Sequence, residues 1–463
     1  MRAKSNTPRK TECLSHNVPQ AGSAMGARRV SRRQLVRYGL GGGAAAALPA
    51  LIPSSALGLA GRTAPGSRVT VAAIGLGFGW PMFLRDDVQY VAVCDVRRDR
   101  REQAREAVDQ RQGSRGCRAY NDFREVLGRD DVDAVYVATP DHWHAVVTIA
   151  AARSGKHVYC QKPLTRTIAE GRAVVEAVRR HGIVFQHGTQ QRHDPPMLFG
   201  CELVQNGYIG ELRHVRIGSP AGVSSGPWRP EPVPDGLDYD LWLGPAPWAP
   251  YTPLRIASHP WYHISDYCMG YIAGWGVHHA DSAMQGSGLD DCLGKVEIDG
   301  RGVFPSEGLF DNPYRWQMHY TFANGLTWHW TDCEGDGFGS RAGPDWPQHR
   351  MGVLLEGTEG WVFIWRGYVD AHPKSLLKVT IGPNAKVQLR RPLQGDFIHC
   401  VRERRKTCAP VEVAHRSTTL CSIGAISMLL RRKLTWDPIK EEFAGDEEAN
   451  RLRSRAMREP WAV

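Results

Sequence analysis

Short apolar runs alternate with helix-like segments in the part of the chain that follows residue 68. Runs in which nearly every position is apolar are typical of strands buried on both faces of a parallel sheet. The pattern predicts strands at 69–74, 90–94, 133–138, 157–160 and 183–187, and helices at 145–153 and 167–180. Strands that alternate with helices indicate an α/β fold with a doubly wound sheet.

The pattern changes in the second half of the chain. After residue 290 the apolar positions become strand-like, with strands predicted at 316–322, 326–330, 352–356 and 361–365 and a helix near 422–430. Asn324-Gly325 between the first two of these strands indicates a hairpin turn. Residues 218–275 interleave tryptophan and tyrosine with proline and glycine, which excludes long helices and predicts ordered surface loops.

A different pattern precedes both halves. Residues 28–60 begin with basic residues that include Arg32-Arg33, continue with an apolar stretch at 38–51 and end in small residues at 58–60. These are the parts of a twin-arginine export signal, so a periplasmic or extracellular location is predicted, with a basic disordered tail as the alternative. The apolar stretch falls short of the roughly 20 residues of a transmembrane helix, so no membrane attachment is expected after signal removal.

The leader accounts for most of the positive charge. Of the formal net charge of +10, residues 1–60 contribute nine basic side chains and one acidic side chain, or +8, which leaves +2 for the remainder. A near-neutral mature chain gives no support for nucleic-acid binding. About 400 residues remain, enough for two domains. The 11 cysteines form no Cys-x-x-Cys pair, which favours buried free thiols over a disulfide framework.

Three glycines follow the first predicted strand, at Gly75, Gly77 and Gly79. Such a turn lets a pyrophosphate approach the backbone amides at a helix N-terminus. The third glycine comes one position early, and Trp80 takes its usual place. Asp95 ends the second strand, 20 residues after Gly75, where a carboxylate can bind ribose hydroxyls. The turn and Asp95 predict bound NAD; NADP is less favoured, although Arg97 could bind its 2′-phosphate.

Two polar turns follow the next pair of strands. Residues 139–144 read Thr-Pro-Asp-His-Trp-His, and residues 161–163 read Gln-Lys-Pro. In a doubly wound sheet, ligands bind beyond the carboxyl ends of the strands, which is where both turns fall. Further cofactor contacts are therefore predicted at Thr139, Pro140, His142, His144, Gln161 and Lys162.

These motifs together resemble the glucose–fructose oxidoreductase / inositol dehydrogenase family (Gfo/Idh/MocA). Gly-Thr-Gln-Gln-Arg at 188–192 and Trp-Gly-Val-His-His-Ala-Asp at 275–281 also carry the resemblance, as do residues 237–247 and 445–450. The resemblance implies a Rossmann domain followed by an α/β domain with a large open, mostly antiparallel sheet, which commonly forms the interface of a dimer or tetramer. The boundaries it implies are an export signal at 1–60, an NAD-binding domain at 68–193, a substrate and oligomerisation domain at 194–445 and a tail at 446–463.

The chemistry implied by the resemblance needs a base. Transfer of a hydride from a carbinol carbon to a nicotinamide requires that the hydroxyl proton be removed. Lys162 is the leading candidate, because burial beside a cationic nicotinamide would lower its pKa; a solvated surface lysine is the alternative. His278 is the second candidate, with a buried histidine bonded to a carbonyl as the alternative. The family pattern Asp-x-Gly-x-His places a catalytic aspartate where this chain has Gly274, and Gln161 stands where the family usually has glutamate.

Several residues are candidates for contact with a sugar, through hydroxyl-binding side chains or aromatic faces that stack on a sugar ring. For most of the aromatic residues of 218–275, packing of the loop onto the domain is favoured over contact with a sugar. A structural role is the alternative for Arg192 and His279. No metal site is expected, because no His-Glu-x-x-His spacing occurs. The predicted substrate contacts are Gln191, Arg192, Trp261, Tyr262, His263 and His279.

The leading hypothesis is an NAD-dependent oxidoreductase that acts on a hydroxyl of a small-molecule sugar, polyol or glycoside. Because an exported enzyme has no NAD pool to draw on, the cofactor is expected to be tightly bound and recycled in place. One alternative is a glycosidase that uses NAD transiently, by oxidation at C3, elimination and addition of water, which the missing aspartate favours. The other alternative is a non-catalytic sugar-binding protein.

Overall fold

The computed structural model describes residues 63–77, 83, 85–332, 351–389 and 395–463. The predicted export signal at 1–60 and the third glycine of the turn, Gly79, lie outside the described residues. The described residues belong to one compact unit, Ser54–Val463.

The first sheet has six parallel strands in the order β3-β2-β1-β4-β5-β6. Its strands are β1 (Val69–Ile74), β2 (Val88–Cys94), β3 (Arg118–Tyr120), β4 (Ala134–Val137), β5 (His157–Cys160) and β6 (Phe185–His187). The helices of this half are η1 (Pro65–Ser67), α2 (Arg98–Gln112), α3 (Phe123–Leu127), α4 (Asp141–Arg153) and α5 (Ile168–His181). The five predicted strands and two predicted helices are present; β1 and β5 have the predicted ends and the others have shifted ends, whereas α2, α3 and β3 have no counterpart in the predicted pattern.

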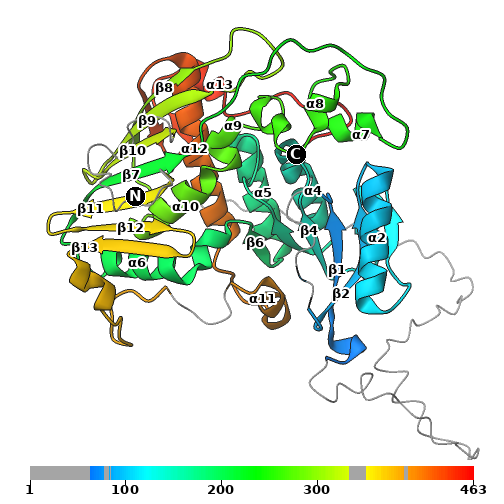
Figure 1. The fold of residues 1–463 in the computed structure, drawn as a ribbon, viewed down its shortest axis with the longest axis horizontal. Helices are drawn as coiled ribbons and strands as arrows, with labels where there is room; N and C mark the ends of the chain where they lie inside the picture. Colours follow the sequence, from blue (N-terminus) through cyan, green and yellow to red (C-terminus); the bar gives the residue numbers. More distant parts are fainter. Residues whose placement is uncertain (1–62, 78–82, 84, 333–350, 390–394) are drawn as a thin grey trace, which may run out of the picture. The chain divides into compact units, whose positions relative to one another are not determined.

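Helices cover both faces of this sheet (Figure 1). One face packs against α4 and α5 through residues such as Val147 and Val174. The other face packs against α2 and α11 (Phe397–Glu403) through Val108 and Phe397. Every residue of β4 and β5 is buried, because a strand covered on both sides has no face toward water. The predicted doubly wound α/β sheet is confirmed.

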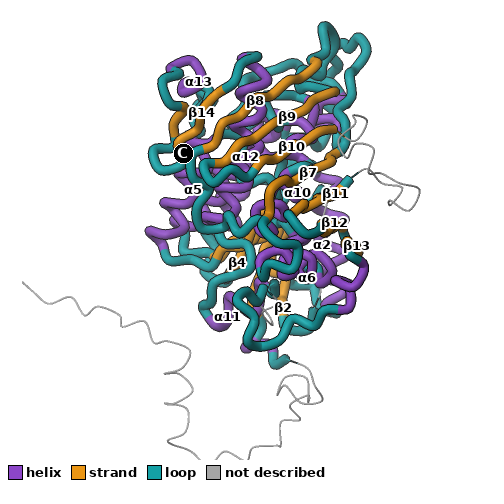
Figure 2. The backbone as a smooth tube through the Cα atoms, turned by 90° about the vertical axis from the view of Figure 1, so that its left-hand side faces the viewer, coloured by secondary structure: helices purple, strands orange, loops and turns teal. Residues whose placement is uncertain are grey.

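The second sheet has nine strands in the order β13-β12-β11-β7-β10-β9-β8-β14-β15. Its β7–β10 pair is parallel and its other described pairs are antiparallel, which confirms the predicted large, mostly antiparallel sheet. Figure 2 shows the strands side by side with helices behind them. They are β7 (Leu212–Ser219), β8 (Val296–Val303), β9 (Arg315–Phe322), β10 (Thr327–Asp332), β11 (Gly352–Gly357), β12 (Trp361–Trp365), β13 (Tyr368–His372), β14 (Leu434–Asp437) and β15 (Glu442–Phe443).

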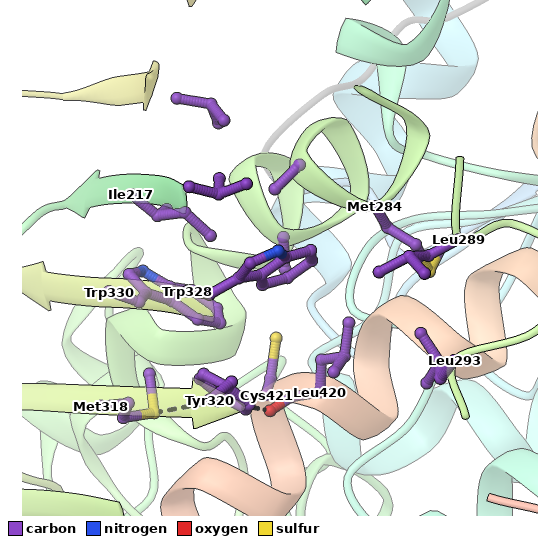
Figure 3. Close-up of a cluster of buried hydrophobic side chains, with 14 of the residues drawn as sticks. Ile217, Met284, Leu289, Leu293, Met318, Tyr320, Trp328, Trp330, Leu420 and Cys421 are labelled. Atoms are coloured by element: carbon purple, nitrogen blue, oxygen red, sulfur yellow. Dashed lines mark hydrogen bonds between the residues drawn. The ribbon is translucent and has the colours of Figure 1, made fainter. Parts of the chain in front are cut away.

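One face of this sheet carries the core of the second half. Buried and exposed residues alternate along β9, so its Met318 and Tyr320 point inward. The Tyr320 hydroxyl donates a hydrogen bond to the carbonyl of Leu420 at 2.8 Å (Figure 3). Leu420 belongs to α12 (Val411–Leu430), which also packs against α5 of the first half. This core therefore holds the helices between the two sheets in place. The other helices here are η2 (Gln190–His193), α6 (Pro195–Gln205), α10 (Val277–Gly286) and η5 (Lys374–Lys378).

Several elements of this half have no predicted counterpart, among them β7, β13, β14, β15 and α6, and two further elements show why the pattern fails. Strand β8 has no predicted counterpart, because Gly300 and Gly302 interrupt its apolar positions. A Cβ at Gly300 would lie 2.8 Å from the carbonyl oxygen of Gly424, so α12 packs directly on the strand backbone. Helix α12 begins at Val411 rather than near 422, because its first turns bury hydroxyl side chains that hide the helical pattern.

The aromatic segment 218–275 forms short helices joined by loops. They are α7 (Tyr239–Leu243), α8 (Pro253–Ile256), η3 (Pro260–His263) and α9 (Gly270–Gly274). Most of its aromatic side chains pack against one another, as the stacked rings of Tyr239 and Trp242 illustrate. Backbone hydrogen bonds from Arg98 to Gly236 and from Asp238 to Val96 join the segment to the end of β2. The segment is thereby fixed beside the carboxyl edge of the first sheet.

The last residues of the chain pack back on the first half. After α13 (Glu447–Arg451), Arg455 pairs with buried Glu170 at 2.7 Å. The ring of Trp461 meets that of Trp143 of α4 edge-on, with 4.6 Å between the ring centroids. Among the described helices, none combines the length and apolarity that crossing a membrane requires.

Candidate active site

A cleft with an empty volume of about 1110 Å³ opens at the carboxyl edge of the six-stranded sheet. The segments that follow β1, β2, β4 and β5 form one wall, and the aromatic segment 218–275 forms the other. Predicted substrate contacts in the lining are Trp261 and Tyr262. Predicted cofactor contacts in the lining are Gly75, Gly77, Asp95, Arg97, Thr139, Pro140, Gln161 and Lys162.

The glycine turn brings two backbone segments into contact. Gly75 has a φ of +84°, and a Cβ there would lie 2.5 Å from the carbonyl carbon of Ala138 and from the nitrogen of Thr139. Only glycine permits this backbone contact. At Gly77 the nearest atom to such a Cβ is Arg100 Nη1, at 3.4 Å. The space beside Gly77 belongs to the cleft, so a ligand can approach the backbone there.

The two glycines are expected to respond differently to alanine. Gly75→Ala should destabilise the fold by about 2–4 kcal/mol, from a backbone clash and an unfavourable φ. Gly77→Ala should change stability by no more than about 1 kcal/mol but weaken NAD binding roughly tenfold, because the methyl group enters the cleft. Urea unfolding and NAD titration measure the two effects. Equal stability of the Gly75→Ala protein and the wild type would contradict this assignment.

Asp95 is buried at the end of β2, where its carboxylate shapes the glycine turn. Its Oδ2 accepts a hydrogen bond from the Leu76 amide and its Oδ1 accepts one from the Arg97 amide, both at 2.9 Å. Burial raises the pKa of this carboxyl, against the two amide donors, which lower it. Carboxylate oxygens can each accept more than one hydrogen bond, so capacity remains for ribose hydroxyls. Arg97 pairs with Asp99 at 2.5 Å, which weakens its attraction for a 2′-phosphate.

His144 ties the turn after β4 to the turn after β5. Its Nδ1 lies 2.7 Å from the carbonyl oxygen of Pro163, and its Nε2 lies 2.9 Å from that of Thr139. Burial lowers the pKa of His144 to about 4, so the ring is neutral at pH 7 and donates one of these bonds. The ring is not part of the cleft lining. His144 therefore joins the two turns, and the cofactor contact predicted for it stays a prediction.

His142 is also internal. Its Nε2 lies 3.0 Å from the carbonyl oxygen of Trp242, and its ring packs on that of Tyr267 with 4.9 Å between the centroids. The side chain is fully buried and does not line the described cleft. The helix turns this ring toward the aromatic segment, and the cofactor contact predicted for His142 stays a prediction.

Lys162 lies where the wall of the cleft formed by the six-stranded sheet meets the wall formed by the aromatic segment 218–275. It is buried, yet it lines the cleft. Its Nζ donates to the carbonyl oxygen of Gly274 at 2.5 Å and to the hydroxyl of Tyr262 at 3.5 Å. Burial lowers the pKa of Lys162, against the charge of Asp141, which raises it. Next to it, Gln161 Nε2 donates to the hydroxyl of Tyr136 at 2.8 Å.

His278 is buried in the first turn of α10, near Lys162. Burial lowers the pKa of His278 well below its usual value, and the charge of Lys162 acts in the same direction. Its Nδ1 has no hydrogen-bond partner among the described residues. The ring is therefore neutral. Like His142 and His144 it does not line the described cleft, and contact of its Nδ1 with a substrate hydroxyl stays a prediction.

Gln191 contacts the backbone of His278. In the amide orientation that satisfies both neighbours, its nitrogen donates to the His278 carbonyl at 3.3 Å and its oxygen accepts from Arg366 Nε at 2.7 Å. Arg366 also lies over the ring of Trp275, 4.8 Å from its centroid. Gln191 therefore connects the His278 turn with the β12–β13 turn.

Arg192 lies in a buried ion-pair network, which is the structural role left open for it beside substrate contact. Its Nε lies 2.7 Å from Asp281 Oδ2, and its Nη1 lies 2.7 Å from Asp290 Oδ2. Burial alone would lower the pKa of Arg192, but the two carboxylates outweigh it and hold the pKa well above its usual value. Its donors are occupied by these carboxylates, so they are not available to a sugar.

Two further predicted substrate contacts lie inside the protein. The ring of His263 packs between those of Tyr271 and Phe310, with centroids 4.9 and 5.2 Å away. His279 Nδ1 lies 3.3 Å from Ser219 Oγ. Neither side chain lines the described cleft, and both pack against other side chains; the substrate contacts predicted for them stay predictions. His279 follows the packing alternative because the helix turns it toward β7.

Three further residues in this region have little or no signal in the local sequence pattern. Asp141 lies within a recognised turn, and burial raises its pKa to about 7, against Cys268 and Lys162, which lower it. Trp275 precedes the helix that carries His278. Its indole NH has no hydrogen-bond partner among the described residues, a feature that only the tertiary structure reveals. Arg366 lies in an unremarkable hairpin turn, so no local pattern could have indicated it.

The described residues contain nine cysteines, all free thiols and seven of them buried. This agrees with the preference for thiols over a disulfide framework. Within the same residues, no group of three or more histidine, cysteine or acidic side chains is arranged to hold a metal ion.

Two family profiles match the chain. The profile for the NAD-binding Rossmann fold of the Gfo/Idh/MocA oxidoreductases matches residues 69–189, and the profile for their C-terminal alpha/beta domain matches residues 221–463. The chain belongs to the Gfo/Idh/MocA oxidoreductase family. Its six-stranded sheet thus belongs to the NAD-binding Rossmann domain of that family, and the cleft beside Gly77 and Asp95 lies at the carboxyl edge of that sheet.

Individual relatives match over shorter stretches. The levoglucosan dehydrogenase of Pseudarthrobacter phenanthrenivorans is 36% identical over 96 residues, which are 21% of this chain and 25% of that protein. A glycosyl hydrolase family 109 protein of Saccharopolyspora erythraea is 34% identical over 139 residues, 28% of this chain and 30% of that protein. The chain spans between 25% and 41% of the length of the first three curated relatives it matches.

A solved structure shares the fold over most of the chain. Levoglucosan dehydrogenase in complex with NADH and L-sorbose superposes with a TM-score of 0.56 and 17% identity, over 80% of this chain and 99% of that one. The two-sheet architecture of this Gfo/Idh/MocA protein is therefore found in known structures.

Proposed function

We propose that the protein is an NAD-dependent dehydrogenase that oxidises a carbinol group of a sugar, polyol or glycoside. The observation that carries the proposal is the position of Lys162. It is a buried amine in the lining of the cleft, where the wall formed by the sheet meets the wall formed by the aromatic segment. Bound NAD⁺ supplies the hydride acceptor. Side chains of this protein supply the remaining functions of the site, which are cofactor binding, substrate binding and removal of the hydroxyl proton.

Residues on the sheet side fit the cofactor. The open space beside Gly77 accepts a pyrophosphate, and the Asp95 carboxylate accepts hydrogen bonds from ribose hydroxyls. Thr139 Oγ1 is buried without a described partner and lines the cleft, so a polar group of the ligand would satisfy it. These residues support NAD, and Asp95 disfavours the extra phosphate of NADP by repulsion.

Residues on the other side fit a polyhydroxylated substrate. Lys162 removes the hydroxyl proton, a role that its lowered pKa supports because the free amine becomes available nearer neutral pH. The neutral imidazole of His278 orients the same or the adjacent hydroxyl through Nδ1. Trp261 and Tyr262 present aromatic faces on which a sugar ring can stack while water is excluded. The sugar dehydrogenase name of the first relative supports this substrate class.

We also propose that the protein is exported with its cofactor in place. Arg32-Arg33 and the apolar stretch at 38–51 support the twin-arginine route. Outside the cytoplasm the cofactor cannot be replenished, so oxidation of one substrate would be coupled to reduction of another. Protein purified from the periplasm should then carry nicotinamide through gel filtration, and protein that loses it would contradict internal recycling.

For the oligomeric state, we propose a homo-dimer or homo-tetramer that uses the open face of the nine-stranded sheet. Gln317, His319 and Thr321 of β9 are exposed on that face, in alternation with the buried residues of the core. Light scattering after size exclusion measures the mass directly. A monomer at micromolar concentration would contradict the proposal.

A redox glycosidase is the second candidate. The glycosyl hydrolase relative and the glycine at position 274 favour it. In that reaction, oxidation at C3 acidifies the C2 proton, the aglycone leaves by elimination, water adds, and the hydride returns to C3. Lys162 could serve as a base in this reaction as well.

One assay separates the candidates. Purified protein is incubated with NAD and a panel of free sugars and polyols, and separately with nitrophenyl glycosides, while absorbance at the NADH and nitrophenol bands is followed. NADH formation without nitrophenol supports the dehydrogenase, and nitrophenol release without net NADH supports the glycosidase. Sugar binding with neither signal would contradict both and leave a binding protein.

A further inference from the structure

We propose that Tyr262 takes the place of the acidic side chain missing at Gly274 and positions Lys162 for proton transfer. The inference rests on the proposed function for its catalytic meaning, but its structural content concerns the contact between two side chains. Tyr262 is then a positioning residue as well as part of the aromatic lining of the cleft.

The first observation is steric. A Cβ at Gly274 would lie 2.7 Å from Tyr262 Cδ1, 3.0 Å from Cε1 and 3.3 Å from Cγ. Real Cβ atoms do not approach ring carbons this closely, so the tyrosine ring occupies the space that a side chain at position 274 would need. Gly274 and Tyr262 are thus a matched pair: any larger residue at 274 requires a smaller one at 262.

The second observation is the hydrogen bonding of Lys162. Its Nζ donates to the carbonyl oxygen of Gly274 at 2.5 Å and to the hydroxyl oxygen of Tyr262 at 3.5 Å. The same Nζ lies 5.3 Å from the centroid of the Tyr262 ring. Both atoms that accept from Lys162 therefore belong to this matched pair of residues. A neutral hydroxyl replaces the charge that a carboxylate would provide.

The third observation is that Tyr262 is held rigidly. Its carbonyl accepts a hydrogen bond from Asn312 Nδ2 at 3.1 Å, and its amide donates to the carbonyl of His259. His259 has a φ of +73°, an uncommon value for a non-glycine residue, at the start of η3. Trp261 packs on the Tyr262 ring with 4.1 Å between the centroids. Burial raises the pKa of Tyr262 well above its usual value, so it remains a neutral phenol.

The electrostatic surroundings of Lys162 predict the direction in which its pKa changes in each variant. When Lys162 takes up a proton, the phenol oxygen can accept from the ammonium and stabilise it, less strongly than a carboxylate would. Removal of the hydroxyl should therefore lower the pKa of Lys162, and introduction of a carboxylate at 274 should raise it. The titratable or charged groups that face Lys162 are Asp141 and His144 of α4, His187 of β6, Cys268, His278 of α10 and Arg366.

The experiment measures the protonation of Lys162 itself. The full-length protein is labelled with an amine-reactive anhydride across a pH series, and the modified fraction of the Lys162 peptide is read by mass spectrometry. Tyr262→Phe should move the labelling midpoint down by roughly 0.5–1 pH unit. Tyr271→Phe is the matched control: its ring lies 6.0 Å from that of Tyr262 but does not line the cleft, so its midpoint should match the wild type.

A pair of variants tests the steric exchange. Gly274→Asp alone should destabilise the protein, because its Cβ meets the Tyr262 ring. The double variant Tyr262→Ala with Gly274→Asp should recover most of that thermal stability. Its Lys162 midpoint should lie about 1–3 pH units above that of Tyr262→Ala, because a carboxylate now faces the amine.

The outcomes distinguish this inference from the proposed function. An unchanged midpoint in Tyr262→Phe, or no recovery of stability in the double variant, overturns the role of Tyr262 even if the wild type oxidises sugars. The predicted midpoint shifts support it even if no sugar in the panel is oxidised. In an active enzyme, the acid limb of the kcat/KM profile should shift with the labelling midpoint in each variant.

Discussion

Lys162→Met is expected to lower the turnover of the preferred sugar by roughly 10²–10⁴-fold, the usual contribution of a positioned general base. Methionine preserves the apolar stem and much of the volume but removes the only amine between the two walls of the described cleft. NAD binding should change little, because Gly77 and Asp95, the residues proposed to hold the other end of the cofactor, are unchanged. Steady-state kinetics and NAD titration measure the two quantities.

Lys156→Met provides a matched control for this substitution. Lys156 is also a buried lysine, and its Nζ donates to the carbonyl of Arg129 at 2.6 Å, away from the cleft. Its replacement should affect stability but not turnover by folded protein. Full turnover in Lys162→Met, or equal losses in both variants, would contradict the assignment of Lys162 as the base.

Arg192→Met is expected to destabilise the protein by about 3–5 kcal/mol, because removal of one partner leaves a buried charge uncompensated. Arg192 and Asp281 are both almost completely buried, and each retains 1% of its side-chain exposure. A loss of this size is a large part of the total stability of a typical domain, about 5–15 kcal/mol. Urea unfolding, followed by circular dichroism, measures the change.

An exposed ion pair supplies the control for Arg192. Arg213 pairs with Glu211 at 2.5 Å, but its side chain is 51% exposed, so Arg213→Met should cost about 0–1 kcal/mol. Adding Asp281→Asn to Arg192→Met should recover part of the loss, since the unpaired carboxylate is then removed. If Arg192→Met instead raised KM for the sugar with unchanged stability, the structural assignment would be overturned and substrate binding restored.

The elements that local pattern predicts well are those whose burial is uniform. Strands β4 and β5 are buried at every position, so their apolar runs identify them without knowledge of their neighbours. The alternation of buried and exposed residues along β9 identifies that strand equally well. The same rules fail for β8 and α12. Gly300 and the buried hydroxyl side chains of α12 lie where two elements pack closely, and neither fits the apolar pattern of a buried strand or helix.

The same contrast separates the candidate site residues. Asp95, Thr139 and Lys162 follow predicted strands, and the carboxyl ends of parallel strands meet at one edge, so topology alone places them together. His142, His263 and His279 have similarly suggestive sequence neighbours, but each ring points into packing rather than the cleft. Which way a side chain on a short helix points depends on the partner against which that helix packs.

The sequence by itself determined the NAD-binding half and the α/β class, because these depend on local apolar runs and turn chemistry, and it predicted the central lysine. Only the tertiary structure decided how the gap at Gly274 is filled. Residues 262 and 274 are 12 positions apart, and the ring of one occupies the space of the other's absent side chain. A steric exchange of this kind leaves no periodic signal, because it is a property of the packed volume and not of the chain.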